Sequence, residues 1–226
     1  HDVSRAEQDA FAMTSQTRAA AAIRDGRFED QITPVSVKVK RDKVDFICDE
    51  HPKQTDEAAL AGLRPVFQKD GSVTAGNASG INDGAAALVL AQASAAQMAG
   101  LRPRARVLGY AHAGVRPAVM GIGPIPAVQN LLQKTGLTVE DFDVIESNEA
   151  FAAQALAVNK ALGLDAARVN PNGGAIALGH PVGATGAILV IKALHELERT
   201  QSDRALITMC IGGGQGIALA IERIAA

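Results

Sequence analysis

The spacing of hydrophobic and polar residues predicts a helix at the beginning of the chain. Residues 6–23 are rich in alanine, which has the highest helix propensity of all residues. Ser4 is a favourable N-cap, and Glu7 stands three positions after it, so the pair has the sequence of a capping box. Gly26 can adopt the left-handed conformation at which many helices end. We therefore expect the first helix to begin after Ser4 and to end before Gly26.

The period of the pattern changes to two after this helix. Valines alternate with serine and lysine over residues 35–40, which predicts a strand with one solvated face. A turn at 41–42 can lead back into the stretch Val-Asp-Phe-Ile at 44–47, so we expect a small antiparallel hairpin. The charged stretch 49–68 is typical of a surface excursion, and a polar, glycine-rich loop follows at 74–84.

Helices and strands alternate in the second half of the chain. A short helix at 94–99 ends at Gly100, and Arg102 and Pro103 follow it, so we expect a domain joint there. Apolar segments of strand length then alternate with longer helical segments, which favours a layered α/β domain. We expect strands at 106–112, 144–146, 205–209 and 217–221, and helices at 126–134, 151–162 and 185–199.

Composition and charge argue against several classes of protein. The chain has 226 residues and a formal net charge of -2, so nothing favours nucleic acid as a partner. No apolar run approaches the ~20 residues of a membrane-spanning helix, so we expect no membrane insertion. The two cysteines, Cys48 and Cys210, are far apart, which argues against a secreted disulfide framework and for a cytoplasmic protein. The chain begins with His1 rather than Met, so we expect a processed product or a piece of a longer protein.

Three loops after Pro103 place polar groups at the ends of predicted strands, where open α/β sheets hold their ligands. The first loop contains Asn148, shortly after the strand at 144–146. The Asn148 amide can hold a water molecule or a substrate oxygen. The alternative is that Asn148 caps the helix that follows it.

The second loop contains His180 between Gly179 and Pro181. Histidine is the commonest acid/base residue in catalysis, and its glycine and proline neighbours leave the ring clear of bulky side chains. Gly183 and Gly186 stand where a helix begins, and the amides of a helix N-terminus attract negative charge. The alternatives are an ordinary surface or core histidine and a nucleotide-phosphate loop, although neither established glycine-rich nucleotide motif is present.

The third loop follows Cys210, which ends an apolar strand and enters a run of glycines. Backbone amides or an imidazole near a thiol can lower its pKa from ~8.5 toward neutrality, so that it acts as an acid or base. The glycines also leave backbone N–H groups free to form an oxyanion hole. The alternative is an inert core cysteine. A zinc site formed by His180, Cys210 and Glu149 matches no metal-ligand spacing, so we expect no metal.

These loops together resemble those of the thiolases, the acetyl-CoA acyltransferases. Three motifs carry the resemblance in the second half of the chain, N-E-A-F-A at 148–152, G-G-A-I-A-L-G-H-P-V-G-A-T-G at 173–186 and C-I-G-G-G-Q-G at 210–216. Three further stretches agree with it, at 4–12, 74–86 and 120–127. The resemblance implies a layered thiolase-like α/β fold, a mixed sheet with helices on both faces, whose N-terminal half is incomplete in this chain.

The resemblance also implies a role for each site residue, in acyl transfer between an enzyme cysteine and coenzyme A. His180 would help to deprotonate the nucleophilic cysteine and would form an oxyanion hole with a water molecule held by Asn148. Cys210 would move the proton of the α-carbon, and the Gly212 amide would contribute to a second oxyanion hole. The positions that match the coenzyme A and acyl pocket are Ser79, Met120, Ala150 and Phe151.

One departure from the family concerns the nucleophile. The family's nucleophilic cysteine lies in a motif like C-G-S-G, and Cys48 does not lie in such a motif. A second histidine of the family's coenzyme A pocket would lie upstream of His1. We therefore expect residues 1–80 to be the end of the loop domain, 81–102 the last elements of the N-terminal domain, and 103–226 the C-terminal domain.

Coenzyme A is expected as a substrate rather than as a covalently bound cofactor. The expected partners are the missing N-terminal half and further copies of the chain, in a dimer or a tetramer. The sequence D-E-H-P at 49–52 favours the degradative 3-ketoacyl-CoA type and β-oxidation of fatty acids. We expect this chain alone to be inactive because its nucleophile is absent. The competing hypotheses are a non-catalytic module that binds coenzyme A thioesters or an assembly partner, and a nucleotide-binding domain.

Overall fold

A mixed sheet of four strands forms the centre of the computed structural model, which describes residues 1–225. The strands follow the order β3-β6-β5-β4. β4 and β5 run parallel, whereas β6 is antiparallel to both of its neighbours. Their bounds are β3 (Ala105–Gly114), β4 (Val144–Ser147), β5 (Arg204–Ile211) and β6 (Gln215–Arg223). The four strands predicted after residue 103 are therefore confirmed.

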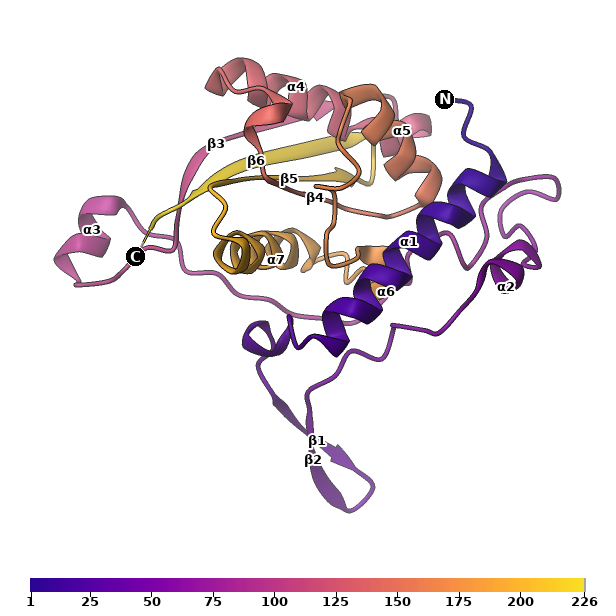
Figure 1. Cartoon of the computed structure of the whole chain (residues 1–226), viewed down its shortest axis with the longest axis horizontal. Coiled ribbons are helices and arrows are strands. Elements are labelled where there is room, and N and C mark those ends of the chain that lie inside the picture. The colour runs from indigo at the N-terminus through magenta and orange to yellow at the C-terminus, as the bar shows by residue number, and fades with distance from the viewer. Residues whose placement is uncertain (226) are drawn as a thin grey trace.

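Helices cover both faces of this sheet, as Figure 1 shows. α4 (Pro124–Thr135) and α5 (Ala152–Leu162) lie on one face, and α7 (Thr185–Thr200) lies on the other. Neighbouring residues of β4 point to opposite faces, as the pleat of a strand requires. Ile145 packs in one core with residues of α4, whereas Val144 packs in the other core with residues of α7. The predicted layered α/β architecture is confirmed.

α1 (Arg5–Arg24) crosses the front of the layers and packs against α5 and the short α6 (Ala175–Leu178). The predicted capping box is present, since the Ser4 hydroxyl accepts a hydrogen bond from the Glu7 amide and the Glu7 carboxylate accepts one from the Ser4 amide at 2.7 Å. Gly26 has a φ of +69° directly after the C-cap residue, so the predicted end of this helix is also confirmed.

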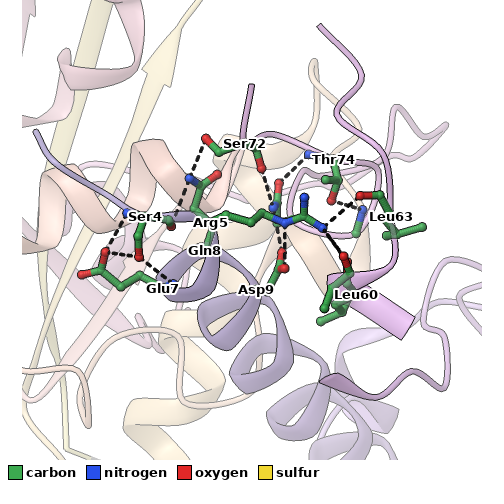
Figure 2. A network of polar contacts seen from close by, with 12 residues as sticks. Ser4, Arg5, Glu7, Gln8, Asp9, Leu60, Leu63, Ser72 and Thr74 are labelled. Carbon is green, nitrogen blue, oxygen red and sulfur yellow. Dashed lines mark hydrogen bonds and ion pairs between the residues drawn. The ribbon is translucent and has the colours of Figure 1, made fainter. Parts of the chain in front are cut away.

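Polar contacts join the first turn of α1 to the segment that leads into the glycine-rich loop, as Figure 2 shows. The Arg5 guanidinium donates to the carbonyls of Leu60 at 2.6 Å and Leu63 at 3.1 Å. It also pairs with Asp9 at 2.7 Å, and Asp9 accepts a hydrogen bond from Asn77 at 2.9 Å. These bonds fix the backbone just before residue 79, which is one of the predicted pocket residues.

The predicted hairpin forms from β1 (Val35–Val39) and β2 (Asp42–Phe46) and projects from the bottom of the molecule in Figure 1. The prediction that only one of its faces is solvated is wrong. Val35 is 57% exposed and Val44 is 49% exposed. A two-stranded ribbon that stands away from the layers buries little of either face, so its apolar side chains stay largely accessible.

Apolar side chains are also exposed in the segment that precedes β3. Ile81 is 96% exposed and Val89 is 91% exposed, in an extended stretch of chain. The predicted helix at 94–99 is present as α3 (Ala93–Met98), which stands apart from the layers at the left of Figure 1, and Met98 is 84% exposed. A contiguous exposed apolar surface, where one forms, marks a contact with another segment or protein.

The sequence pattern does not predict five of the shorter elements, because three to six residues contain too few turns to show a period. These elements are α2 (Glu57–Ala61), α6, η1 (Glu29–Gln31), η2 (Pro117–Ile122) and η3 (Val139–Asp141). Within residues 1–225, no helix combines the length and the apolar character that crossing a membrane requires.

Candidate active site

Asn148 and Cys210 lie at the carboxyl ends of two neighbouring parallel strands. In the register of β4 and β5, Ser147 is opposite Thr208, and the Asn148 amide donates to the Thr208 carbonyl at 3.0 Å. Cys210 follows two residues later on β5, opposite Gly216 of β6. The carboxyl ends of parallel strands are the edge at which α/β sheets hold their ligands. The structure therefore places both predicted catalytic residues at the expected edge.

His180 faces Asn148 across this edge. Nδ2 of Asn148 lies 3.3 Å from Nε2 of His180. The alternative interpretation of Asn148 as a helix cap is wrong, because α5 begins three residues after Glu149 with Phe151 as its N-cap and has no side-chain cap. The backbone amide of His180 donates to Oδ1 of Asn82 at 3.0 Å, which ties the histidine loop to the glycine-rich loop.

The neighbours of His180 determine which of its ring nitrogens carries the proton. Nδ1 lies 2.7 Å from the Thr185 hydroxyl, and that hydroxyl donates its single proton to the Pro181 carbonyl at 2.9 Å. The hydroxyl therefore accepts a hydrogen bond from Nδ1–H. The neutral ring then carries a lone pair on Nε2, which accepts a hydrogen bond from the Asn148 amide. Thr185 is the first residue of α7, so this helix holds the ring in the tautomer that a general base requires.

Burial shifts the pKa values of His180 and Cys210 in opposite directions. It lowers the pKa of the His180 imidazole from its usual value, because the charged ring loses solvation. It raises the pKa of the Cys210 thiol for the same reason. The expectation that nearby amides lower the Cys210 pKa is therefore wrong, because desolvation outweighs them. At neutral pH the site holds a neutral imidazole, which can accept a proton, and a protonated thiol, which can donate one.

Gly212 begins the turn that joins β5 to β6, and it is exposed. Gly214 ends this turn with a φ of +93°, and its carbonyl accepts a hydrogen bond from the Val115 amide at 2.7 Å. A Cβ at Gly214 would stand 2.3 Å from the Val115 carbonyl oxygen, so only glycine fits there. Around Gly212, by contrast, a Cβ would meet no heavy atom of residues 1–225 within 4 Å. The backbone at Gly212 is therefore approachable by a ligand.

Three of the four predicted pocket residues lie together. The Ser79 amide donates to the Ala150 carbonyl at 3.0 Å, and the residue before Ser79 forms a β-bridge with Phe151. The Phe151 ring meets the ring of Phe67 edge to face, with centroids 6.0 Å apart. Met120 lies in η2, which packs against α5 and β5.

A buried polar network behind Asn148 is not predicted by the sequence. Glu149 is 2% exposed, and its carboxylate accepts hydrogen bonds from Ser15 at 2.7 Å and Asn170 at 2.8 Å. Burial raises the Glu149 pKa, and the hydrogen bonds oppose that shift. Ser15 is 134 positions away from Glu149, so no local pattern links the two. The only signal for this network is the position of Glu149 inside the N-E-A-F-A motif.

His51 is a second residue that the fold brings beside the histidine loop. Its Nε2 lies 3.2 Å from the Ile176 carbonyl, and its Nδ1 lies 3.4 Å from Nδ2 of Asn82. Among residues 1–225, no group of three or more His, Cys, Asp or Glu side chains has the arrangement of a metal site. The site offers hydrogen-bond donors, a base and a thiol, which are the groups that acyl-transfer chemistry uses.

Comparison with known families agrees with this set of groups. Residues 101–223 match the family model described as thiolase, C-terminal domain, and residues 1–94 match that described as thiolase, N-terminal domain. The chain is 58% identical to beta-ketothiolase BktB of Cupriavidus necator, over 99% of this chain and 57% of that protein. It is 55% identical to acetyl-CoA acetyltransferase of Escherichia coli K12, over 99% of this chain and 57% of that protein.

Solved structures show the same fold. The acetyl-CoA acetyltransferase of Bacillus anthracis superimposes with a TM-score of 0.97 at 50% identity, over 99% of this chain and 57% of that one. Human mitochondrial 3-ketoacyl-CoA thiolase in complex with CoA superimposes with a TM-score of 0.91 at 43% identity, over 99% of this chain and 56% of that one. The chain thus spans little more than half the length of these relatives, and it belongs to the thiolase family.

Proposed function

We propose that the protein transfers acyl groups between an enzyme cysteine and coenzyme A, in the thiolytic cleavage of a 3-ketoacyl-CoA or the reverse Claisen condensation. The observation that carries this proposal is the contact between His180 and Asn148 at the strand end beside Cys210. The pair offers a base and an amide donor, and the thiol offers an exchangeable proton. Relatives named beta-ketothiolase and acetyl-CoA acetyltransferase support the same chemistry.

The groups divide the reaction between them. His180 Nε2 takes the proton of a nucleophilic cysteine, and the resulting thiolate attacks the 3-keto carbon. The bond between the α- and β-carbons then breaks, and its electron pair forms the enolate of an acyl-CoA. His180 and a water molecule held by Asn148 donate to the enolate oxygen, and Cys210 protonates the α-carbon. Cys210, left as a thiolate, then takes the proton of the thiol of a second coenzyme A, whose sulfur attacks the acyl group on the enzyme cysteine. The Gly212 amide supports the tetrahedral intermediate, which releases the enzyme cysteine to take back its proton from His180.

The nucleophile of this reaction would come from residues outside the chain described here. Cys48 is exposed and does not lie in a motif like the family's C-G-S-G. Cys210 is buried, and in this proposal it already acts as the acid and base. The exposed apolar side chains of Ile81, Val89 and Met98 support a partner segment that covers them, such as the N-terminal half of the family's fold. We propose that residues 1–80 complete a loop domain, 81–102 complete that N-terminal half, and 103–226 form the C-terminal domain.

Thiolysis of acetoacetyl-CoA tests this function. The 226-residue chain alone should show no turnover above background, while calorimetry should detect binding of coenzyme A. Adding a polypeptide with the C-G-S-G-type segment of a relative should restore turnover, and the change His180→Ala in this chain should abolish it. Ordinary turnover by the chain alone would contradict the proposal that the nucleophilic cysteine comes from outside these 226 residues. Binding of coenzyme A with no turnover after reassembly would favour the non-catalytic module.

A further inference from the structure

The buried side chain of Glu149 connects the segment that holds Asn148 with the segment that precedes His180. Its neighbour Asn148 points toward His180, while the Glu149 side chain points into the interior and is 2% exposed. Oε2 accepts hydrogen bonds from the Ser15 hydroxyl at 2.7 Å and from the Ile176 amide at 3.2 Å. Ile176 lies in α6, and His180 follows that helix by two residues. The carboxylate therefore connects the segment of Asn148 to α6, the helix that directly precedes His180.

The backbone at Ser147 and Asn148 is fixed by hydrogen bonds from the Asn170 side chain and from the neighbouring strand. Asn170 donates from Nδ2 to the Ser147 carbonyl and accepts at Oδ1 from the Ser147 amide, at 2.8 and 2.9 Å. The same Nδ2 group donates to Oε1 of Glu149 at 2.8 Å. The Asn148 amide is held by Thr208 of the neighbouring strand at 3.0 Å. Asn148 thus has a position that the sheet determines.

On the histidine side, His180 itself bonds to Asn82 and Thr185, and the segment before it is anchored on Glu149. Gly174 donates its amide to the Ser15 hydroxyl at 3.0 Å, and that hydroxyl donates to Glu149. A Cβ on Gly174 would stand 2.1 Å from Cδ of Glu149, so the loop passes directly over the carboxylate. One helical turn then separates this anchor from His180, since the Gly179 amide bonds to the Ala175 carbonyl at 2.9 Å. A shift of the anchor would displace the imidazole.

We infer that Glu149 is a positioning residue, whose buried carboxylate sets the separation between Asn148 and His180. This inference rests on the proposed function, in which those two residues act together. Glu149 touches no reacting atom in that mechanism and acts through the peptide of Ile176 and the Ser15 hydroxyl. A carboxyl group suits the task because all three of its hydrogen-bond partners donate to its two oxygens.

The change Glu149→Gln tests the inference because it keeps the size of the side chain and replaces an acceptor oxygen with a donor. The 226-residue chain, labelled with nitrogen-15 in its histidine rings, reports on His180 by NMR, and the variant His180→Gln identifies the signals. We expect Glu149→Gln to shift both ring-nitrogen signals of His180 and to reduce the population of the Nδ1–H tautomer. The matched control is Glu196→Gln, another buried carboxylate, which bonds to Asn172 and Arg199 instead. The control should leave the His180 signals unchanged.

Circular dichroism gives the melting temperature of each variant, and the NMR spectra are recorded at a temperature at which all of them are folded. Unchanged His180 signals in Glu149→Gln, with only a lower melting temperature, would overturn the inference and leave a purely structural role. Equal shifts in both glutamine variants would overturn it as well. If Glu149→Gln does not fold, Ser15→Ala replaces it in the same measurement. We expect a smaller shift of the His180 ring-nitrogen signals, and unchanged signals would overturn the inference. The NMR readout needs no turnover, so a failure of thiolysis alone would reject the proposed function and leave the positioning role standing.

Discussion

The side-chain amide of Asn148 lies 3.3 Å from Nε2 of His180, although the two residues are 32 positions apart in the sequence. Each residue is held on its far side. The Asn148 backbone bonds to Thr208 of β5 at 3.0 Å, and the His180 ring bonds to Thr185 of α7 at 2.7 Å. Donors that are fixed before the reaction stabilise developing charge without having to reorganise. The asparagine is 1% exposed, so the contact is shielded from bulk solvent.

Asn148→Ala should lower the turnover of the reassembled enzyme by about 10²–10³-fold, because it removes a donor that orders the oxyanion site. KM should change much less, since the lost interaction belongs to the transition state rather than to bound substrate. Steady-state thiolysis of acetoacetyl-CoA measures both constants. Asn130→Ala is the matched control, because Asn130 is exposed on α4 and its side chain donates to the His112 carbonyl at 3.3 Å rather than to a site residue. A higher KM with unchanged turnover in Asn148→Ala would contradict the assigned role.

The stability of the chain should depend on pH through His180. Burial lowers its pKa in the folded chain below the ~6.5 of an unfolded histidine, so the unfolded chain binds the proton first as the pH falls. The free energy of unfolding contributed by His180 is therefore present above pH ~6.5 and is lost as the pH falls from there toward the folded pKa. Below the folded pKa the loss levels off.

Urea unfolding of the parent chain and of His180→Gln, between pH 8 and pH 5, isolates this contribution. The buried carboxyls of Glu146 and Glu149 have raised pKa values and titrate with the opposite sign, but they are common to both proteins. The difference in unfolding free energy between parent and variant should fall with decreasing pH. A difference that stays constant over this range would show that His180 does not lose solvation on folding.

The sequence predicts those parts of the fold that depend on local chemistry. The capping box of Ser4 and Glu7 and the left-handed stop at Gly26 are found where they are expected, because each involves neighbouring residues. The strand ends carry Asn148 and Cys210 as predicted, since the buried strands of an α/β sheet are marked by apolar runs. The resemblance to thiolases supplies the roles that these residues would play.

The sequence does not predict exposures, pKa shifts or hydrogen bonds that depend on distant parts of the chain. The hairpin has the period of a half-buried strand, yet it stands in solvent, because the pattern does not reveal what lies against it. The raised pKa of Cys210 follows from the burial of β5 between two layers, which outweighs the loop amides beside it. The bond between Ser15 and Glu149 spans 134 positions and can be found only in the fold.

The two cysteines should differ in their reaction with iodoacetamide. Cys48 is exposed, whereas Cys210 is buried and has a raised pKa, so less of it is thiolate at any given pH. At pH 8 we expect modification of Cys48 first and of Cys210 much more slowly, as followed by peptide mass spectrometry. In urea the two rates should become similar, which provides the control. Equal rates in the folded chain would contradict the burial of Cys210.

Gly174→Ala should destabilise the chain by about 1–3 kcal/mol, because added volume in a packed interior displaces its neighbours. The new Cβ would stand 2.1 Å from Cδ of Glu149, whose side chain is held by three hydrogen bonds and cannot withdraw easily. Gly183→Ala is the matched control in the same motif, since a Cβ there meets no heavy atom of residues 1–225 within 4 Å. Urea unfolding measures both variants, and equal losses of stability would contradict the close packing at Gly174.

Lys192 and Glu146 form an ion pair between α7 and β4, at 2.8 Å and almost fully buried. Lys192 also donates to the Gly173 carbonyl at 2.6 Å, so it holds the beginning of the histidine loop. Lys192→Met should cost about 3–5 kcal/mol of unfolding free energy, because it leaves Glu146 without its counter-charge. Burial already raises the Glu146 pKa, and removal of the lysine takes away the main attraction that opposes this rise.

The double variant Lys192→Met with Glu146→Gln separates the charge from the packing. Removing both charges avoids an uncompensated carboxylate, so we expect the double variant to regain a large part of the stability lost in Lys192→Met. Urea unfolding at pH 7 of the parent, both single variants and the double variant gives the coupling energy between the two positions. If the two single losses simply add, the residues act independently, and the buried pair does not stabilise the loop through its charge.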